Sequence, residues 1–195
     1  MIANTIKQNK SRNIFDDHAE LWLFAYGSML FKIDFEYLEK RPAHILGWDR
    51  KFWQGSHDHR GTQSNPGRVV TLVESPERCC EGVAILITPD VFEYLDIREK
   101  NGYLRTTVEI IFQDKTSCEG LVYIANPGNP AFLGPATDDD IAKQVVKSAG
   151  PSGSNTEYVT SLACALRELG AHDEHVYSIE RFVSDYNKSM HETSS

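Results

Sequence analysis

Residues 21–30 read LWLFAYGSML, an apolar run that stops at Gly27-Ser28. The part from Leu21 to Tyr26 is apolar or aromatic throughout, which is typical of a short strand buried on both faces. A strand that ends in a Gly-Ser turn can present several backbone N–H groups in one direction and so hold an anion. Taken alone the pattern is weak, because most such junctions use glycine only for its backbone freedom.

Composition limits the possible classes of protein. The chain has 195 residues, 41% hydrophobic and 10% aromatic, which is enough for one domain with a sizeable core. Its formal net charge of −8 argues against nucleic acid and anionic membranes as partners. No apolar run approaches the roughly 18 residues of a membrane helix, and residues 1–20 lack the apolar core of a signal peptide. We therefore expect a cytoplasmic protein whose four cysteines are buried reduced thiols.

The first two thirds of the chain predict mainly strands. Residues 34–56 alternate over short distances and predict one or two bent strands broken near Gly47. The apolar runs 69–73 and 82–87 predict adjacent antiparallel strands joined by the turn-rich segment SPERCCE. Two further strands are expected, at 103–112 and 120–124.

One helix interrupts the strands. Thr88-Pro89-Asp90 predicts its start, with Thr88 as N-cap, and Asn101-Gly102 predicts its end. Val91, Tyr94 and Leu95 would share its inner side.

The last third predicts helices only. A helix capped by Thr137 should end before Gly150, a second should run to Gly170, and a third should cover 173–187. Strands followed by helices predict an α+β fold in which a curved sheet or small barrel carries helices on its outside. We expect one domain over residues 20–187, with flexible tails at 1–19 and 188–195.

Residues 57–68, HDHRGTQSNPGR, have the composition of a loop. His57 and His59 could form a metal pair, but a third ligand at useful spacing is missing, so polar lining of a cleft is the better interpretation. Arg60 and Arg68 could attract an acidic substrate, although a solvated arginine is the default.

Five collinear segments resemble one known family. They are FAYGSML (24–30), FWQGSHDHRGTQSNPGRVVTLVE (52–74), YLDIREKNGY (94–103), FLGPA (132–136) and AGPSGSNTEYV (149–159). Together they resemble the ChaC branch of the γ-glutamylcyclotransferases over about residues 20–185. The YGS motif is shared by the wider superfamily, whereas the second and last segments are far more specific. Met29 and Asn101 depart slightly from the family pattern, at positions where the side chain should carry no chemistry.

The resemblance implies a small mixed β-barrel with peripheral helices. It also implies cyclisation of a γ-glutamyl group, with glutathione as the small-molecule substrate and 5-oxoproline and cysteinylglycine as products, without metal or other cofactor. It assigns substrate binding to the loop Leu23, Phe24, Ala25, Tyr26, Gly27, Ser28 and Met29 and to Tyr158, and general acid/base catalysis to Glu99. The expected assembly is a monomer or weak homodimer.

Elementary chemistry supports a carboxylate in that role. The attacking ammonium must lose a proton and the leaving amine must gain one, and a single carboxylate between them can do both. Glu99 lies at the predicted helix end, where the helix dipole raises the pKa of a carboxyl group while Arg98 and Lys100 oppose this. Glu74 and Glu93 are the other carboxylates to consider.

Other roles stay open at this stage. Ser28 is not expected to be a nucleophile, because no GxSxG elbow surrounds it. One alternative is an enzyme for other γ-glutamyl peptides or amines, and another is a catalytically idle regulatory binding module.

Overall fold

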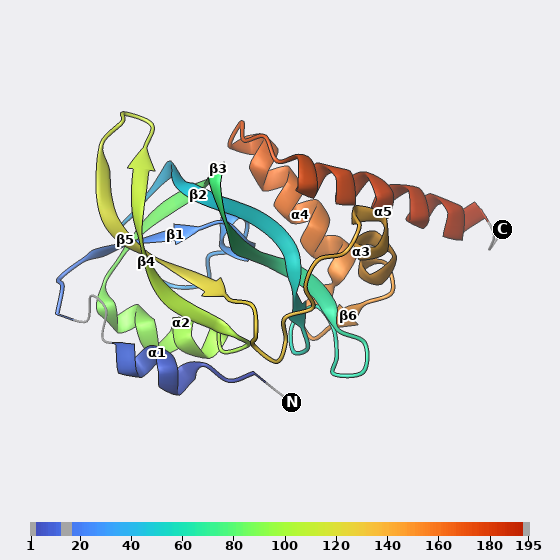
Figure 1. Cartoon of the computed structure of the whole chain (residues 1–195), viewed down its shortest axis with the longest axis horizontal. Helices are drawn as coiled ribbons and strands as arrows, with labels where there is room; N and C mark the ends of the chain where they lie inside the picture. The colour runs from blue at the N-terminus through green and yellow to red at the C-terminus, as the bar shows by residue number, and fades with distance from the viewer. Residues whose placement is uncertain (1–2, 13–16, 193–195) are drawn as a thin grey trace.

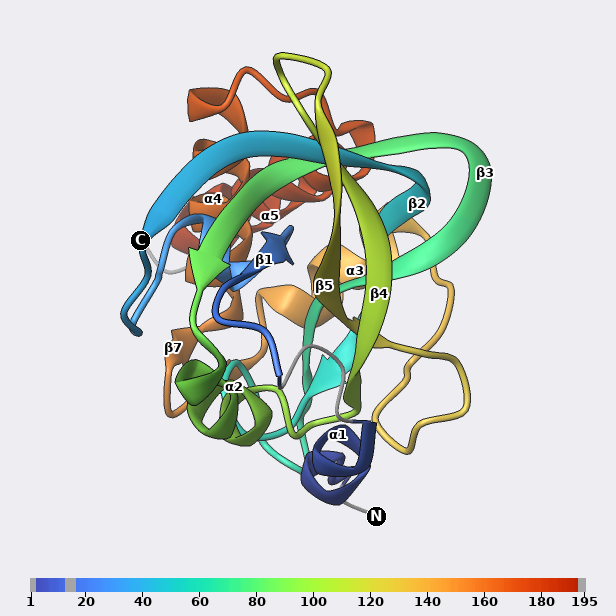
Figure 2. The same cartoon turned by 90° about the vertical axis from the view of Figure 1, so that its left-hand side faces the viewer.

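The structure is a computed structural model that describes residues 3–12 and 17–192. Its centre is a closed barrel with the strand order β1-β3-β2-β4-β5, seen from the side in Figure 1 and nearly end-on in Figure 2. The strands are β1 (Leu21–Ala25), β2 (Glu39–Ser56), β3 (Gly67–Ile87), β4 (Tyr103–Phe112) and β5 (Ser117–Ala125), with the short pair β6 (Ala149–Gly150) and β7 (Gly153–Ser154) outside the barrel. The α+β barrel predicted from the sequence is confirmed.

Strand β1 closes the barrel. It pairs antiparallel with β3, and it pairs parallel with β5 where Leu23 meets Leu121. Every residue of β1 except Trp22 is buried, as the continuous apolar run predicts for a strand covered on both faces.

Strands β2 and β3 form one long, curved hairpin (Figure 2). β2 is continuous, and it bends near Gly47, which has φ +81° and marks a break in the register with β3. The prediction of two strands at 69–73 and 82–87 is wrong, because both runs belong to β3. They pair with the two halves of β2, and residues 75–78 bulge out between them.

The helices are η1 (Ser28–Leu30), η2 (Pro89–Val91), α1 (Ile6–Arg12), α2 (Phe92–Arg98), α3 (Asp138–Val145), α4 (Asn155–Glu168) and α5 (Glu174–Glu192), where η denotes a 3₁₀ turn. Helices α3, α4 and α5 gather on one side of the barrel (Figure 1). Thr137 caps α3 as predicted, by accepting a hydrogen bond from Asp140 N–H. Within the described part of the chain, no helix is both long and apolar enough to span a membrane.

Several predicted details around the helices are wrong. Thr88 makes no capping hydrogen bond to the backbone, and a 3₁₀ turn precedes α2. Tyr94 points outward and is 42% exposed, while Val91 and Leu95 are buried. The cysteines are free, but only Cys80 is buried.

The terminal segments differ from the expected tails. Residues 6–12 form α1, which packs beside α2 and β4 (Figure 1), and α5 continues to Glu192 beyond the predicted end at 187. The predictions for residues 1–2, 13–16 and 193–195 lie outside the described residues. No apolar periodicity in the sequence predicts this helix, because the residue that it buries fully against the barrel is the polar Asn9.

Candidate active site

A cavity of about 400 Å³ lies where the end of β1 meets the end of α2. Its wall includes the turn after β1, the C-terminal residues of α2, part of the loop after β2, and Tyr158 from α4. The expected residues that line it are Phe24, Ala25, Tyr26, Gly27, Ser28, Met29, Glu99 and Tyr158. Leu23 does not line it: this side chain is fully buried in the barrel core, because alternate residues of a strand face opposite sides.

The turn after β1 has the form of a helix start. Gly27 is the N-cap of η1, and Leu30 N–H donates to Gly27 O at 3.0 Å. The first N–H groups of a helical turn have no partner within that turn, so those of Ser28 and Met29 can serve a ligand. Gly27 has φ −121° and ψ −131°, a combination outside both the α and the β regions. Space at this position is also limited, because a Cβ there would lie 3.1 Å from Val70 Cγ2 and 3.4 Å from Tyr158 Oη.

Arg50 fixes the backbone at the start of this turn. Its Nε donates to Tyr26 O at 2.7 Å, and its Nη1 pairs with Asp173 just before α5. The guanidinium is 2% exposed, so it depends on these partners. No sequence pattern indicates this role of Arg50, since one arginine in a predicted strand gives no sign of a buried ion pair.

Glu99 lies at the C-terminal end of α2, and its N–H donates to Leu95 O at 2.8 Å. Burial of its carboxylate raises its pKa to about 6, because removal from water disfavours the charged form. Arg98 opposes this shift, and the negative charges of Asp34 and Asp58 add to it. A carboxylate with a pKa near neutrality is well suited to accept a proton and return it.

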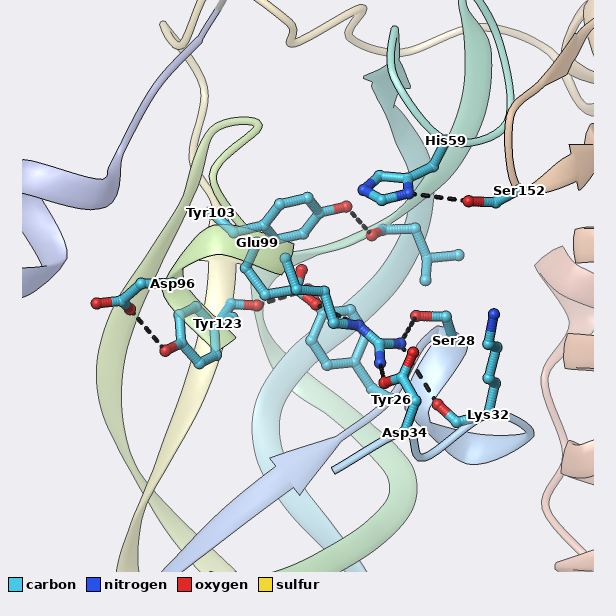
Figure 3. Close-up of polar contacts among 12 residues, drawn as sticks. Tyr26, Ser28, Lys32, Asp34, His59, Asp96, Glu99, Tyr103, Tyr123 and Ser152 are labelled. Carbon is cyan, nitrogen blue, oxygen red and sulfur yellow. Dashed lines mark hydrogen bonds and ion pairs between the residues drawn. The ribbon is translucent and has the colours of Figure 1, made fainter. Parts of the chain in front are cut away.

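Arg98 connects the carboxylate with the turn. Its Nε lies 3.3 Å from Glu99 Oε1, while its Nη2 donates to Ser28 Oγ at 2.9 Å. Its Nη1 pairs with Asp34 (Figure 3). The position of Ser28 relative to Glu99 is therefore fixed by one planar, multiply bonded group.

Buried amide groups hold the segment after Glu99. Gln54 Nε2 donates to Asn101 O at 2.7 Å, and Asn101 Nδ2 donates to Gly55 O at 2.9 Å. Gly102 has φ +96°, and a Cβ there would lie 2.6 Å from Asn129 Oδ1, so both its conformation and its surroundings require glycine.

A second set of contacts fixes α2 itself. Asp96, 1% exposed, pairs with Arg105 of β4 at 2.8 Å and accepts a hydrogen bond from Tyr123 Oη at 2.8 Å (Figure 3). The buried ion pair fastens the helix to the barrel wall. The glutamate at its end is therefore presented by a rigid element.

Five tyrosines line the cavity: Tyr26, Tyr94, Tyr103, Tyr123 and Tyr158. Tyr26 donates to Tyr123 O and Tyr103 donates to Val70 O, so both are committed within the barrel. Tyr158 Oη accepts from Val70 N–H at 3.4 Å and can still donate its own hydrogen to a ligand. Burial raises the pKa of Tyr158 to about 12, which keeps the hydroxyl protonated at neutral pH.

The other residues considered for the site differ in whether they line the cavity. Glu74 and Glu93 are exposed and do not line the cavity. Arg60 lines the cavity and pairs with Glu157 at 3.1 Å. Arg68 does not line it, so the expectation that it attracts substrate is wrong: it is buried and donates to Phe52 O and Gly134 O.

The loop after β2 adds a group that no sequence pattern indicates. Asp58 lines the cavity, and its Oδ1 is buried without a hydrogen-bond partner among the residues that the structure describes. Among the residues that the structure describes, no three His, Cys, Asp or Glu side chains gather as metal ligands would, so His57 and His59 gain no third ligand there. A metal-free site stays a prediction.

Solved structures share this barrel. A crystal structure titled as a γ-glutamyl cyclotransferase specific to glutathione, from yeast, matches with a TM-score of 0.81 and 31% identity, covering 87% of this chain and 97% of the yeast chain. A structure titled γ-glutamyl cyclotransferase shows the same fold at 17% identity, with a TM-score of 0.54, over 83% of this chain and 86% of its own. Fold and pocket together define the γ-glutamylcyclotransferase class of enzymes.

Within that class the sequence is more specific. The profile of the ChaC-like protein family matches residues 21–186, and the chain belongs to that family. Glutathione-specific γ-glutamylcyclotransferase 1 of Danio rerio is 40% identical over 181 residues, which cover 88% of this chain and 92% of the relative. γ-Glutamylcyclotransferase 2-3 of Arabidopsis thaliana is 44% identical over 176 residues, covering 84% and 88%. The predicted family is confirmed.

Proposed function

We propose that this protein is a glutathione-specific γ-glutamylcyclotransferase that converts glutathione to 5-oxoproline and cysteinylglycine, with Glu99 as the general acid/base. The observation that carries the proposal is the Glu99 carboxylate, whose side chain is only 14% exposed and has a pKa of about 6, on the wall of the cavity that the glycine-serine turn also lines. The names of the relatives from Danio rerio and yeast support glutathione as the substrate.

The turn after β1 is the proposed anchor. The α-carboxylate of the γ-glutamyl group would accept hydrogen bonds from the N–H groups of Ser28 and Met29 at the start of η1. An anchor at that end leaves the α-amine and the γ-carbonyl of the same molecule to fold toward each other. Intramolecular reactions held in this way can gain on the order of 7–11 kcal/mol from orientation.

Glu99 would then act first as a general base and afterwards as a general acid. Its carboxylate takes a proton from the α-ammonium, and the free amine nitrogen attacks the γ-carbonyl carbon to form the new C–N bond. The carboxyl group gives this proton to the cysteinyl nitrogen as the old C–N bond breaks and the carbonyl re-forms. The extra proton on the new ring nitrogen passes to the released amine, which leaves as an ammonium, so the ring nitrogen keeps one hydrogen and the charge is conserved. No water is consumed, and the proton count on Glu99 is restored.

Tyr158 is the proposed donor to the substrate oxygen. Its hydroxyl is protonated at neutral pH and is supported by Val70 N–H. The γ-oxygen gains negative charge when the amine attacks, and a fixed donor in a buried site stabilises that charge.

The direct test is incubation of the purified chain with glutathione, followed by mass analysis for 5-oxoproline and cysteinylglycine. We expect both products without added metal or nucleotide. Glutathione acetylated on the γ-glutamyl nitrogen should be inert, because its amine can no longer attack. Release of free glutamate would indicate hydrolysis, and activity that is lost with EDTA and restored by zinc would contradict the metal-free mechanism.

Matched substrates test the specificity. Other γ-glutamyl peptides and γ-glutamylamines, assayed beside glutathione, should give much lower kcat/KM. Equal turnover of these substrates would support the broader enzyme, and binding of glutathione without turnover would support an idle binding module.

The remaining proposals concern the cellular form of the protein. We propose a single catalytic domain, formed by residues 20–187 together with α1 and the end of α5, that acts in the cytoplasm as a monomer or weak homodimer. Support comes from the acidic charge of the chain, which disfavours anionic membranes as partners.

A further inference from the structure

Helix α1 lies against the backbone that carries Glu99, although it precedes residues 21–186, the part that matches the family. We propose that α1 and Thr5, the residue directly before it, form a brace for the catalytic glutamate, with Thr5 and Asn9 as positioning residues. The inference rests on the proposed role of Glu99. It adds a part of this chain that the family match does not contain.

Thr5 lies against the C-terminal end of α2. Its N–H and its Oγ1 both donate to Lys100 O at 3.0 Å, and Oγ1 lies 3.5 Å from Glu99 O. The last carbonyl groups of a helix have no partner inside it, so they need donors from elsewhere. Thr5 is 6% exposed and supplies such donors at the residues that orient the carboxylate.

Asn9 holds the start of β4, at the other end of the segment from Glu99 to Tyr103. Its Nδ2 donates to Tyr103 O at 3.1 Å, and its Oδ1 accepts from Arg105 N–H at 3.0 Å. One fully buried side chain therefore pairs with two backbone groups at the start of β4. Arg12 adds a hydrogen bond from Nη1 to Arg105 O at 2.6 Å.

The segment from Glu99 to Tyr103 is thus held by two separate elements. Strand β2 reaches it through Gln54 and Gly55, which both form hydrogen bonds with Asn101. The N-terminal segment reaches it through Thr5 and through Asn9 of α1, and both views place α1 beside α2 (Figures 1 and 2).

This arrangement should act on the chemical step. None of the α1 residues lines the cavity, so α1 cannot contribute to binding by contact. It can act only by fixing the backbone from which the Glu99 side chain extends. Displacement of a reacting group by about 1 Å can cost about 10² in rate, so loss of the brace should lower kcat more than it changes KM.

The experiment uses the full chain with single substitutions. Thr5→Val removes the hydroxyl at nearly constant volume, Thr5→Ser keeps it, and Asn9→Ala removes both side-chain bonds to β4. Lys7→Ala is the control, because Lys7 is exposed on the same helix. Glutathione turnover is measured well below each variant's melting temperature. We expect Thr5→Val to lower kcat about tenfold and Asn9→Ala somewhat more, with KM changed less than twofold, while Thr5→Ser and Lys7→Ala stay near wild type.

A double substitution separates positioning from general stability. In the Glu99→Gln background, Thr5→Val should cause no further loss, because it acts through the carboxylate that is gone. A kcat within twofold of wild type for Thr5→Val would overturn the brace, as would the same tenfold loss in the Glu99→Gln background. If Glu99→Gln itself retained full activity, the proposed function of Glu99 would fail instead, which is a different result from failure of the brace. If Asn9→Ala does not fold, Thr5→Val alone decides.

Discussion

Arg98 Nε lies 3.3 Å from Glu99 Oε1, so the residue beside the proposed base is also its counter-ion. Burial alone would raise the pKa of Glu99 further, and Arg98 limits the increase. The same guanidinium donates to Ser28 Oγ in the anchor turn. One side chain therefore couples the basicity of the carboxylate to the place where the substrate is held.

The pH dependence of activity follows from this balance. Glu99 must be ionised to accept a proton, and its pKa is about 6. We expect log(kcat/KM) to fall with a slope of 1 as the pH drops below about 6. Arg98→Met should move this limb to higher pH, because it removes the charge that favours the carboxylate. A profile that stays flat down to pH 4.5 would contradict the assignment of Glu99.

Glu99→Gln should abolish turnover while glutathione still binds. Glutamine has nearly the same shape, but it cannot accept the ammonium proton at neutral pH. Loss of a positioned acid/base group should lower kcat by at least about 10², while Kd, measured by calorimetry, should stay within about tenfold because the proposed anchor is a separate turn.

Glu93→Gln is the matched control for that variant. It changes the same residue type on the same helix, but Glu93 is exposed and lies outside the cavity. We expect wild-type kcat. If Glu99→Gln kept more than about a tenth of the wild-type kcat, where at least about 10² should be lost, Glu99 would not be the base.

Glu99→Gln should also make the protein more stable at neutral pH. The pKa of Glu99 is raised in the folded state from 4.5 to about 6, so ionisation opposes folding. This cost appears as the pH rises from about 4.5 to 6 and is complete above that range, where it amounts to about 2 kcal/mol. Thermal unfolding of Glu99→Gln should show a higher Tm at pH 7.5 and little difference at pH 4. A lower Tm at pH 7.5 would mean that the ionised carboxylate stabilises the fold.

Gly27→Val should impair binding more than folding. The Cβ of valine would lie 3.1 Å from Val70 Cγ2 and 3.4 Å from Tyr158 Oη. Such overpacking typically costs about 1–3 kcal/mol, and it would push the proposed N–H donors away from the substrate. We expect a folded protein by circular dichroism whose KM for glutathione rises at least about tenfold. Unchanged KM and kcat would remove the anchor hypothesis.

Tyr158→Phe tests the proposed oxygen donor. The ring contacts with Phe31 and Phe52 would remain, whereas the hydroxyl that faces the cavity would be lost. We expect kcat to fall about 10²–10³-fold, the range for loss of one donor to a developing negative charge, with little change in Tm. If only Tm decreases and kcat does not, Tyr158 has a packing role alone.

Local sequence patterns predicted much of the fold. The apolar run at β1, the Thr137 cap of α3 and the strand at Tyr103–Phe112 are all confirmed. These features depend on interactions between residues close in the chain, or on burial of a whole element, and both leave a local pattern. The family segments brought Glu99, Gly27 and Tyr158 together as candidates, and the cavity wall includes all three.

The parts that the sequence could not reveal depend on partners distant in the chain. Arg50 with Asp173, and Arg98 with Ser28, are pairs that only the folded barrel brings together. The sequence predicts separate strands at 69–73 and 82–87 because the intervening SPERCCE resembles a turn, although residues 79–81 pair with β2 and only 75–78 bulge out. Helix α1 was missed because its burial depends on one asparagine that pairs with backbone groups rather than on an apolar face.

The closure of the barrel by β1 has a consequence for synthesis of the protein. β1 is made early, but its pairing with β3 and β5 requires segments that follow much later, including Leu121. On the ribosome, the most apolar strand of the barrel must therefore wait without partners while the β2–β3 hairpin forms. Non-local pairing of this kind is slow, and unpaired strands favour aggregation. We expect the yield of native protein to depend on chaperones that cover residues 21–30 in the nascent chain.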